Sequence, residues 1–379
     1  MSDSKIYIVG VGMTHFGRHL EASISELLDT AILRAADDAG CTKAAVEAVY
    51  HSSATQGFLQ GQTFVPGQVA LSKIGLTGIP AFNIENACAS SSSSFHLAVQ
   101  ALKAGMQDVV LAAGVEKMNV PDKARMFAVF DGGWDVETPE ENAKRLLQLG
   151  EGVAEPEGSE SERPYSVFMK IYAAFGRNHM KRYGTTQRQI AAIAAKNHQH
   201  SEHNEYSQYR QPYTIDEILS APPITYPLTL PMCSPISDGA AALVLSRESV
   251  AKENGQEAVA KIVAMAAHAQ EPSEFTVAPI GAIEKVLSEA GWSADDVDLW
   301  EVNEAFACVA MFAMRDIGIP HEKINVNGGG TALGHPIGAS GARIIVTLLN
   351  ALKQQGKTRG VASLCIGGGE ATAVALEIL

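Results

Sequence analysis

The chain repeats itself once, and this duplication limits the possible folds more than any other feature. Two segments of the first half match the second half at shifts of 251 and 250 positions, and one strand-like segment matches at a shift of 242. The second copy therefore holds eight more residues between that strand and the helix that follows it. The matching segments are 39–40 and 46–49 with 290–291 and 297–300, 82–84 with 324–326, and 101–103 with 351–353. A repeat of this length predicts two similar halves within the 379 residues.

Each copy alternates between patterns typical of helices and of strands. The first copy predicts a helix at 24–40, strands at 46–53 and 81–85, a helix at 90–104 and a strand at 108–113. The second predicts the same order at 278–291, 297–302, 323–327, 339–355 and 360–366. Such alternation favours an α/β fold in which helices cover sheets. Related halves would bring their strand-to-helix turns to one shared mouth, where α/β proteins usually bind ligands.

A segment of different character separates the copies. It begins with an acidic, loop-rich stretch at 131–162, continues through helical sequence at 165–203 and ends in a Pro-rich run at 222–235. We expect this segment, the cap, to cover the mouth, and the first copy to resume with a strand at 237–245. The predicted division is 1–118 with 236–256 for the first half, 119–235 for the cap and 257–379 for the second half.

The charge and the cysteine content exclude several classes of protein. A net charge of −13 argues against nucleic acid and anionic membranes as partners, although a local basic patch could still hold an anionic ligand. The five cysteines are far apart and form no CxxC pair, which argues against disulfides and zinc and favours a reducing compartment. We find no signal-peptide pattern, no apolar run of membrane-spanning length and no peroxisomal address. We therefore expect a cytoplasmic protein.

Cys88 is the first candidate catalytic residue. It stands between a predicted strand and a predicted helix, just before five consecutive serines at 90–94. A thiol at a helix N-terminus feels the positive end of the helix dipole, which favours the nucleophilic thiolate. The alternative is an inert buried cysteine.

Three further residues stand where chemistry is expected. His335 follows Gly334 on a Gly-rich turn, so it could face a cleft and act as a base, or it could be an ordinary loop histidine. Cys365 ends an apolar strand just before three glycines, and its alternative role is packing in the core. Asn303 follows another strand and could hold a water or a carbonyl oxygen, or it could cap the next helix.

Four segments together resemble the signature blocks of the thiolase family, in the family's order. They are NACASS at 86–91, NEAFA at 303–307, GGGTALGHPIGASGAR at 328–343 and CIGGG at 365–369. The resemblance covers the whole chain and implies a duplicated, five-layered αβαβα thiolase fold with an inserted loop domain. It also implies transfer of an acyl group between a 3-ketoacyl-CoA and coenzyme A, by thiolytic cleavage or, in the reverse direction, by Claisen condensation.

The resemblance assigns roles to the candidate residues. Cys88 would become acylated, His335 would activate it and help to stabilise the thioester oxygen, and Cys365 would serve as acid and base. Asn303 would position a water beside His335 in one oxyanion hole. The backbone N–H groups of Cys88 and Gly367 would form the other.

The family also implies a binding residue and an assembly. Ser234 matches a serine that contacts the pantetheine chain, coenzyme A is a substrate, and no permanently bound cofactor or metal is expected. A homodimer or homotetramer is implied by the resemblance. The chain resembles the sterol-carrier-protein-type branch of the family at 8–17, 183–186 and 231–235. That branch commonly has His-Asp-Cys-Phe, however, where this chain has Asn303-Glu304-Ala305-Phe306. The acyl chain length stays open for that reason.

Other functions remain as alternatives. The main one is a non-thiolytic thiolase-like acyltransferase or C–C lyase subunit that acts with a small partner protein. A ketosynthase and an inactive acyl-CoA-binding or lipid-transfer module are the others. His198, His200 and His203 could suggest a metal site, although a solvated helix face is the simpler interpretation. Some basic residues of the cap could bind the coenzyme A phosphates: Arg163, Lys170, Arg177, Lys181, Arg182, Arg188, Lys196 and Arg210.

Overall fold

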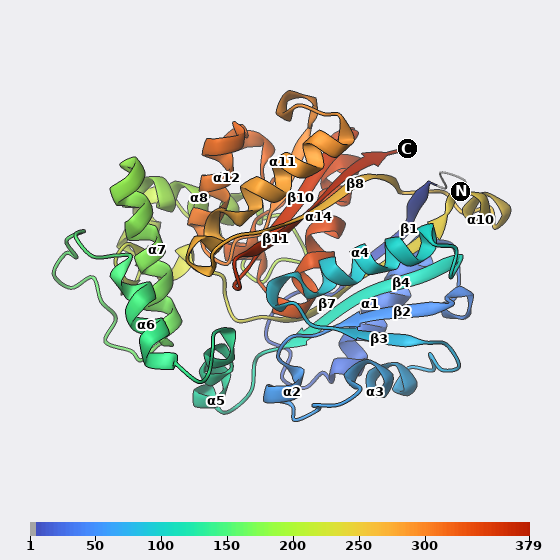
Figure 1. The fold of residues 1–379 in the computed structure, drawn as a ribbon, viewed down its shortest axis with the longest axis horizontal. Coiled ribbons are helices and arrows are strands. Elements are labelled where there is room, and N and C mark those ends of the chain that lie inside the picture. Colours follow the sequence, from blue (N-terminus) through green and yellow to red (C-terminus); the bar gives the residue numbers. More distant parts are fainter. Residues whose placement is uncertain (1–4) are drawn as a thin grey trace.

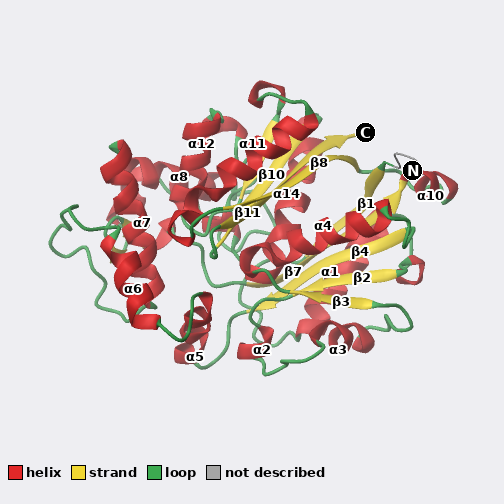
Figure 2. Ribbon diagram, in the orientation of Figure 1, coloured by secondary structure: helices red, strands yellow, loops and turns green. Residues whose placement is uncertain are grey.

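A computed structural model describes residues 5–379 and contains one large mixed sheet (Figures 1 and 2). The strand order is β3-β2-β4-β7-β1-β8-β11-β10-β9. The first five of these strands come from the first half and the last four from the second. Their bounds are β1 Ile6–Met13, β2 Ala48–Ser52, β3 Ala81–Ile84, β4 Val109–Lys117, β7 Asp238–Arg247, β8 Ala260–Ala269, β9 Leu299–Val302, β10 Arg359–Ile366 and β11 Glu370–Ile378.

The two groups of strands repeat one topology. In the first, β1 is antiparallel to β7, β7 is antiparallel to β4, and β4 and β3 lie parallel to β2. In the second, β8, β11, β10 and β9 have the same relations as β1, β7, β4 and β2. Only Tyr7 and Ile8 of β1 pair with β8, so the groups meet along a short seam. The duplication predicted from the sequence is confirmed.

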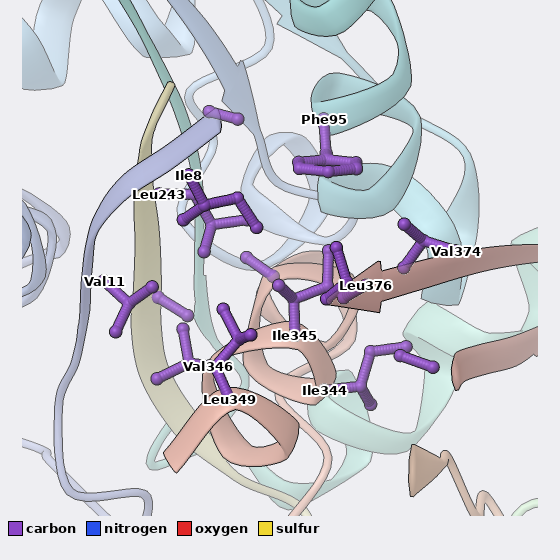
Figure 3. Close-up of a cluster of buried hydrophobic side chains, with 14 of the residues drawn as sticks. Ile8, Val11, Phe95, Leu243, Ile344, Ile345, Val346, Leu349, Val374 and Leu376 are labelled. Atoms are coloured by element: carbon purple, nitrogen blue, oxygen red, sulfur yellow. The ribbon is translucent and has the colours of Figure 1, made fainter. Parts of the chain in front are cut away.

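Helices divide the fold into five layers. The paired helices α4 (Ser90–Lys103) and α14 (Ser340–Gln355) lie between the two groups of strands and pack against both groups and each other. Figure 3 shows this central core, with Phe95 of α4 near Ile345 of α14 and Val374 of β11. Helices α1 (Ile24–Asp38) and α3 (Pro66–Lys73) cover one outer face, and α11 (Ala278–Ala290) and α12 (Ala307–Ile317) cover the other. The fold class implied by the resemblance is confirmed.

The central helices approach closely because small residues face each other. A Cβ atom at Gly341 of α14 would lie 2.2 Å from the backbone nitrogen of Ser92 in α4, a separation that atoms do not tolerate. Next to this contact, the backbone N–H of Ala342 donates to the Ser91 hydroxyl at 2.9 Å. The serine run and the Gly-Ala run are therefore complementary surfaces, and they fix the helix starts that carry Cys88 and His335.

The chain between β4 and β7 forms helices and one small hairpin, which stand at one end of the molecule in Figure 1. The acidic stretch at 131–162 was expected to be loop-rich, but it contains α6, which begins with Pro139 and two glutamates that favour a helix start. The elements are α5 Lys123–Ala128, α6 Pro139–Gln148, α7 Val167–Tyr183, α8 Gln187–His200, α9 Ile215–Ser220, β5 Pro223–Thr225 and β6 Leu228–Thr229. Elsewhere lie the short helices α2 Gln56–Leu59, α10 Glu248–Glu253 and α13 Gly330–Leu333.

The strand predicted at 323–327 is wrong. Only Ile324 forms a bridge, to Trp300 in β9, at the place that β3 occupies in the first half. Asn325 then takes a left-handed backbone conformation with φ of 50°, which ends the ladder. Its side chain replaces the lost ladder bonds, because Oδ1 accepts from Val302 N at 2.8 Å and Nδ2 donates to Val302 O at 2.9 Å. No helix within residues 5–379 has the length and apolar character needed to cross a membrane.

Candidate active site

Cys88 lies in a short 3-10 turn (Ala87–Ala89) that leads directly into α4. The serine run anchors this turn, because Ser90 Oγ accepts from Asn86 N and the Asn86 amide donates to Ser93 Oγ, both at 2.9 Å. Ala87 has a positive φ of 44°, so the backbone bends sharply just before the cysteine. The side chain of Cys88 is half-buried and lines the large pocket described below.

The imidazole of His335 faces the Cys88 thiol. Its Nε2 lies 3.3 Å from Cys88 Sγ, and its Nδ1 lies 2.6 Å from Ser340 Oγ. The Ser340 hydroxyl donates its own hydrogen to Pro336 O at 2.9 Å, so it can only accept from Nδ1. The hydrogen bonds therefore fix the tautomer with the proton on Nδ1, which leaves the lone pair of Nε2 directed at the thiol.

Burial keeps this pair neutral. It raises the pKa of the Cys88 thiol to about 12. Burial and then the nearby charge of Arg343 lower the pKa of His335 to about 3. Loss of solvation therefore opposes the stabilisation of a thiolate that the dipole of α4 was expected to provide. The thiol must lose its proton to Nε2 as it attacks, when a substrate carbonyl can accept the charge.

Cys365 lies at the end of β10, behind the surface of the pocket. Its side chain is 1% exposed and packs with Ile171, Phe175, Phe275 and Val309. Burial raises the pKa of the Cys365 thiol well above the ordinary value, and the charge of Cys88 raises it further. The two thiols therefore share one neighbourhood, although Cys365 does not line the pocket.

Asn303 follows β9 and is fully buried. Its Oδ1 accepts a hydrogen bond from the guanidinium of Arg343, whereas its Nδ2 has no partner among the described residues. Arginine carries only donors, so the atom of the amide that faces it must be the oxygen. Arg343 thus determines the orientation of the Asn303 amide and leaves two N–H groups free to donate.

Gly367 and Ser234 both line the pocket. Gly367 stands in the exposed turn between β10 and β11, and no atom approaches within 4 Å of the position where a side chain would begin. Ser234 is half-buried, and its backbone N–H donates to Ala305 O at 3.0 Å. That bond joins the Pro-rich end of the cap to the NEAFA segment.

The pocket has a volume of about 2110 Å³. Cys88, His335, Gly367 and Ser234 line it, Cys365 packs behind lining residues, and Asn303 is buried and is not part of the lining. The structure thus brings predicted residues of both halves to one pocket, four of them in its lining.

Three residues near the site were not predicted from the sequence. Tyr172 of α7 lines the pocket together with Cys88 and packs against the cluster that contains Cys365, and burial raises its pKa. Ser340 and Arg343 lie inside a recognised motif, but their roles depend on contacts across the fold. An aromatic residue in a helix is usually part of a core, so the sequence around Tyr172 did not indicate that this residue lies at the site.

A fourth unpredicted residue, Glu116, connects the loops around the site. Its buried carboxylate accepts hydrogen bonds from Ser53, Ala54 and Thr55, and also from the backbone N–H of Gly338 at 2.8 Å. Burial raises the pKa of Glu116, and these donated hydrogen bonds oppose the rise. Glu116 therefore holds the turn after His335 against the first half of the chain.

The three clustered histidines were expected to form a solvated helix face, and for His198 this is wrong. Its ring is buried beside Tyr209 and Tyr213, at centroid distances of 6.3 and 5.0 Å. Nδ1 of His200 lies 3.1 Å from the carbonyl oxygen of Asn325. Within residues 5–379, no three His, Cys, Asp or Glu side chains are grouped in a way that could hold a metal ion.

Most basic residues of the cap have local partners. Lys170, Arg177, Arg182 and Arg188 form ion pairs with acidic side chains, and Lys196 is buried and donates to Ile324 O. Of the eight proposed phosphate ligands, only Arg210 lines the pocket. His15 and Arg18, which the sequence analysis did not select, line it too.

Comparison with known proteins agrees with this geometry. Residues 6–219 match the model of the thiolase N-terminal domain, and residues 256–378 match that of the thiolase C-terminal domain. An acetyl-CoA acetyltransferase of Yarrowia lipolytica is 34% identical over 98% of this chain and 96% of its own length. A probable acetyl-CoA acyltransferase of Staphylococcus aureus is 32% identical over 84% of each chain.

Solved structures show the same fold. Human mitochondrial 3-ketoacyl-CoA thiolase in complex with CoA superposes with a TM-score of 0.80 at 23% identity, covering 99% of this chain and 98% of the other. Acetyl-CoA acetyltransferase from Syntrophomonas wolfei superposes with a TM-score of 0.79 at 25% identity, covering 99% of this chain and all of the other. The motifs, the duplicated fold and these matches lead to one conclusion: the chain belongs to the thiolase family.

Proposed function

We propose that this chain is a thiolase that transfers an acyl group between a 3-ketoacyl-CoA and coenzyme A through an acylated Cys88. The observation that carries the proposal is the 3.3 Å contact between Cys88 Sγ and the unprotonated Nε2 of His335, with a second thiol, Cys365, in the same neighbourhood. A nucleophile and a base within hydrogen-bond reach, with the base oriented by a third group, are the requirements for covalent catalysis.

In the first half-reaction, Cys88 passes its proton to His335 and its sulfur attacks the 3-keto carbon. The bond between C2 and C3 then breaks, and its electron pair leaves as the enolate of acetyl-CoA. Cys365 protonates C2 of this enolate, which releases acetyl-CoA and leaves a Cys365 thiolate. The raised pKa of the Cys365 thiol suits a group that must stay protonated until a strong base forms beside it.

In the second half-reaction, the Cys365 thiolate takes the thiol proton of a new coenzyme A. The resulting coenzyme A thiolate attacks the thioester on Cys88, and the Cys88 sulfur leaves. His335 returns its proton to that sulfur, so the enzyme ends as it began. The same steps run backwards give the Claisen condensation.

A negatively charged oxygen develops in both half-reactions, and two sets of hydrogen-bond donors are available to stabilise it. We assign one to the free N–H groups of Asn303, acting through a water beside His335, and the other to the backbone N–H groups of Cys88 and Gly367. The fixed amide of Asn303 supports the first assignment, and the open backbone at Gly367 supports the second. Preorganised donors of this kind are worth about 10²–10³ in rate for each donor removed.

Coenzyme A enters as a substrate, and no permanently bound cofactor takes part. We assign the pantetheine chain to Ser234 and the phosphates to the basic side of the pocket, at His15, Arg18 and Arg210. Arg18→Glu and Arg210→Glu should each raise the KM for coenzyme A with little change in kcat. Unchanged KM in both variants would contradict the phosphate assignment.

We also propose a homodimer, with β3 at the interface. This strand ends the sheet, so one of its edges has no partner within the described chain. Phe82 on β3 is 43% exposed, and Phe64, which stands just before α3, is 79% exposed. An edge strand with exposed aromatic residues favours pairing with a second copy.

Three further expectations are retained as proposals. The division into two halves with a cap at 119–235 is supported by the position of α5–α9 between β4 and β7. Five free cysteines support the cytoplasm or another reducing compartment. The sterol-carrier-type branch is supported only by the sequence similarity at 8–17, 183–186 and 231–235.

The test of the proposed function is thiolysis by the purified protein. With coenzyme A and 3-ketoacyl-CoA substrates of several chain lengths, we expect acetyl-CoA and the shortened acyl-CoA in equal amounts, and no product from Cys88→Ala. If every chain length is inert, the alternative of a lyase or acyltransferase subunit that needs a small partner protein replaces this proposal.

A further inference from the structure

One wall of the pocket consists of apolar side chains that are only partly buried, and two of them, Trp134 and Leu146, lie at the edge of the small core cluster that contains Cys365. Helix α5, the 3-10 turn Val129–Gly133 and helix α6 contain no buried residue. Their larger apolar side chains are half-buried and line the pocket, together with Trp134 between the turn and α6. The residues concerned are Phe127, Val129, Phe130, Trp134 and Leu146. These elements expose their apolar faces to the cavity, as expected if a ligand completes their packing.

A row of aromatic rings connects this wall to the candidate active site. The Trp134 ring lies 4.6 Å from Phe168 of α7, and Phe168 lies 6.5 Å from Tyr172. The Tyr172 ring lies 3.9 Å from that of Phe306 in the NEAFA segment, packs against the cluster that contains Cys365, and lines the same pocket as Cys88. An apolar group attached to Cys88 would therefore find a continuous aromatic surface that leads into the cap.

Another part of the pocket lining is basic rather than apolar. The basic side chains of His15, Arg18 and Arg210 come from two segments that are joined by a hydrogen bond from Phe16 N to Tyr206 O of 2.9 Å. The pocket thus has two arginines here for an anion and aromatic side chains from α5 to α7 for an apolar group, with Arg145 of α6, Cys88 and His335 also in its lining. Its volume of about 2110 Å³ is well above the roughly 300–1,000 Å³ of ordinary small-molecule sites, which leaves room for an acyl group much larger than acetyl.

We propose that the aromatic wall binds a large apolar acyl group, so that the preferred substrates are 3-ketoacyl-CoAs with a medium or long chain, or with a ring, rather than acetoacetyl-CoA. This inference rests on the proposed function, because it places the acyl group on Cys88. It makes Trp134 and Phe168 determinants of substrate specificity. It also differs from the substrate that the name acetyl-CoA acetyltransferase gives to the Yarrowia relative.

The test compares kcat/KM for thiolysis across straight-chain substrates from acetoacetyl-CoA to 3-ketododecanoyl-CoA. Each added methylene that reaches the wall should raise kcat/KM about fourfold, until the wall is covered. A substrate that ends in a phenyl ring, 3-keto-5-phenylpentanoyl-CoA, tests whether the wall prefers a ring or an unbranched chain on the acyl group. A value above that of the straight chain of equal length indicates a ring-bearing substrate, and a lower value indicates an unbranched chain.

Substitution of Trp134 locates the effect. In Trp134→Ala, the ratio of kcat/KM for 3-ketodecanoyl-CoA to that for acetoacetyl-CoA should fall about tenfold. The matched control is Trp292→Ala, which removes another half-buried tryptophan that packs on Arg359 and does not line the pocket. That control should leave both values at the wild-type level. In the inactive Cys88→Ala protein, calorimetry should show tighter binding of decanoyl-CoA than of acetyl-CoA, and Trp134→Ala should reduce the difference.

The outcomes separate the two proposals. Efficient turnover of acetoacetyl-CoA with no gain from longer chains would overturn the acyl-wall inference and leave the thiolase function intact. No turnover of any chain length would overturn the function itself. A gain with chain length that Trp134→Ala and Trp292→Ala reduce equally would also overturn the assignment to this wall.

Discussion

The contact between Arg343 and Asn303 supports a prediction in which a loss of stability can be reversed while a loss of kcat remains. Arg343 is fully buried and donates to Glu301, which is 1% exposed, and to the Asn303 amide. Arg343→Met would remove the charge and leave the Glu301 carboxylate buried without its ion-pair partner. Loss of one partner of a buried pair costs about 3–5 kcal/mol, a large part of the roughly 5–15 kcal/mol that holds a domain folded.

The loss should depend on pH in a defined direction. Burial already raises the pKa of Glu301 to about 7 against the opposing effect of Arg343, so removal of Arg343 raises this pKa further. A carboxyl group whose pKa is raised in the folded state does not destabilise the protein at a pH below its unfolded pKa. Above that pH it lowers the free energy of unfolding, and the loss grows as the pH rises towards the folded pKa. Urea denaturation should therefore show a larger loss for Arg343→Met at pH 8 than at pH 6.

The double variant Arg343→Met/Glu301→Leu tests the positioning role. Replacing both members of a buried pair by apolar residues removes the orphaned charge, so most of the lost stability should return. The Asn303 amide still lacks its anchor, so kcat should remain about 10²–10³ below wild type, the effect of losing one oxyanion donor. Adding Asn303→Ala to the double variant should lower kcat no further. A double variant with wild-type kcat would refute the claim that Arg343 orients Asn303.

Three other predictions follow from burial and the pKa shifts. Because the pKa of Cys88 is raised and His335 is neutral, alkylation of Cys88 by iodoacetamide should still accelerate above pH 8, and His335→Ala should need a still higher pH. A rate that is constant above pH 6 would indicate that Cys88 is already a thiolate in the free enzyme. Cys365 is almost fully buried, so peptide mapping should find it alkylated much more slowly than Cys88, and equal rates would contradict its placement behind the pocket wall. His51 is fully buried, neither ring nitrogen has a partner among residues 5–379, and burial lowers its pKa to about 4. The contribution of the neutral ring to the free energy of unfolding is therefore full above pH 6.5, and it falls by about 2 kcal/mol at pH 5. The unfolding free energy of His51→Leu should therefore drop less than that of wild type between pH 7.5 and pH 5, and an equal drop would refute the assignment.

Much of the fold could be predicted because the signals were local or repeated. The duplication predicted the order of helices and strands in both halves, and flanking glycines and serines marked the turns that carry Cys88, His335 and Cys365. The strand at 323–327 failed because Asn325 takes a left-handed conformation and its side chain replaces backbone hydrogen bonds. A period-two pattern contains no information on such a replacement.

The parts of the site that were missed depend on contacts between distant segments. The direction of the Asn303 amide is set by Arg343, forty residues later in the chain, and the tautomer of His335 is set by the hydroxyl of Ser340. The effect of burial on the pKa of Cys88 was also missed, because its position at a helix start was visible in the sequence, whereas its burial was not. The aromatic wall was not predicted, because Trp134 and Leu146 lie in the stretch expected to be acidic and loop-rich, and half-burial around a cavity leaves no mark on the sequence.

The central claim is that Cys88 carries the acyl group while His335 accepts its proton. The most direct measurement is mass spectrometry of peptides after the enzyme has reacted with a 3-ketoacyl-CoA in the absence of coenzyme A and has been stopped in acid. The account predicts one acyl group on the peptide that contains Cys88 in wild type, and strongly slowed acylation in His335→Ala. An acyl group found on Cys365 or another residue instead, or equally rapid acylation of Cys88 without the imidazole, would contradict it.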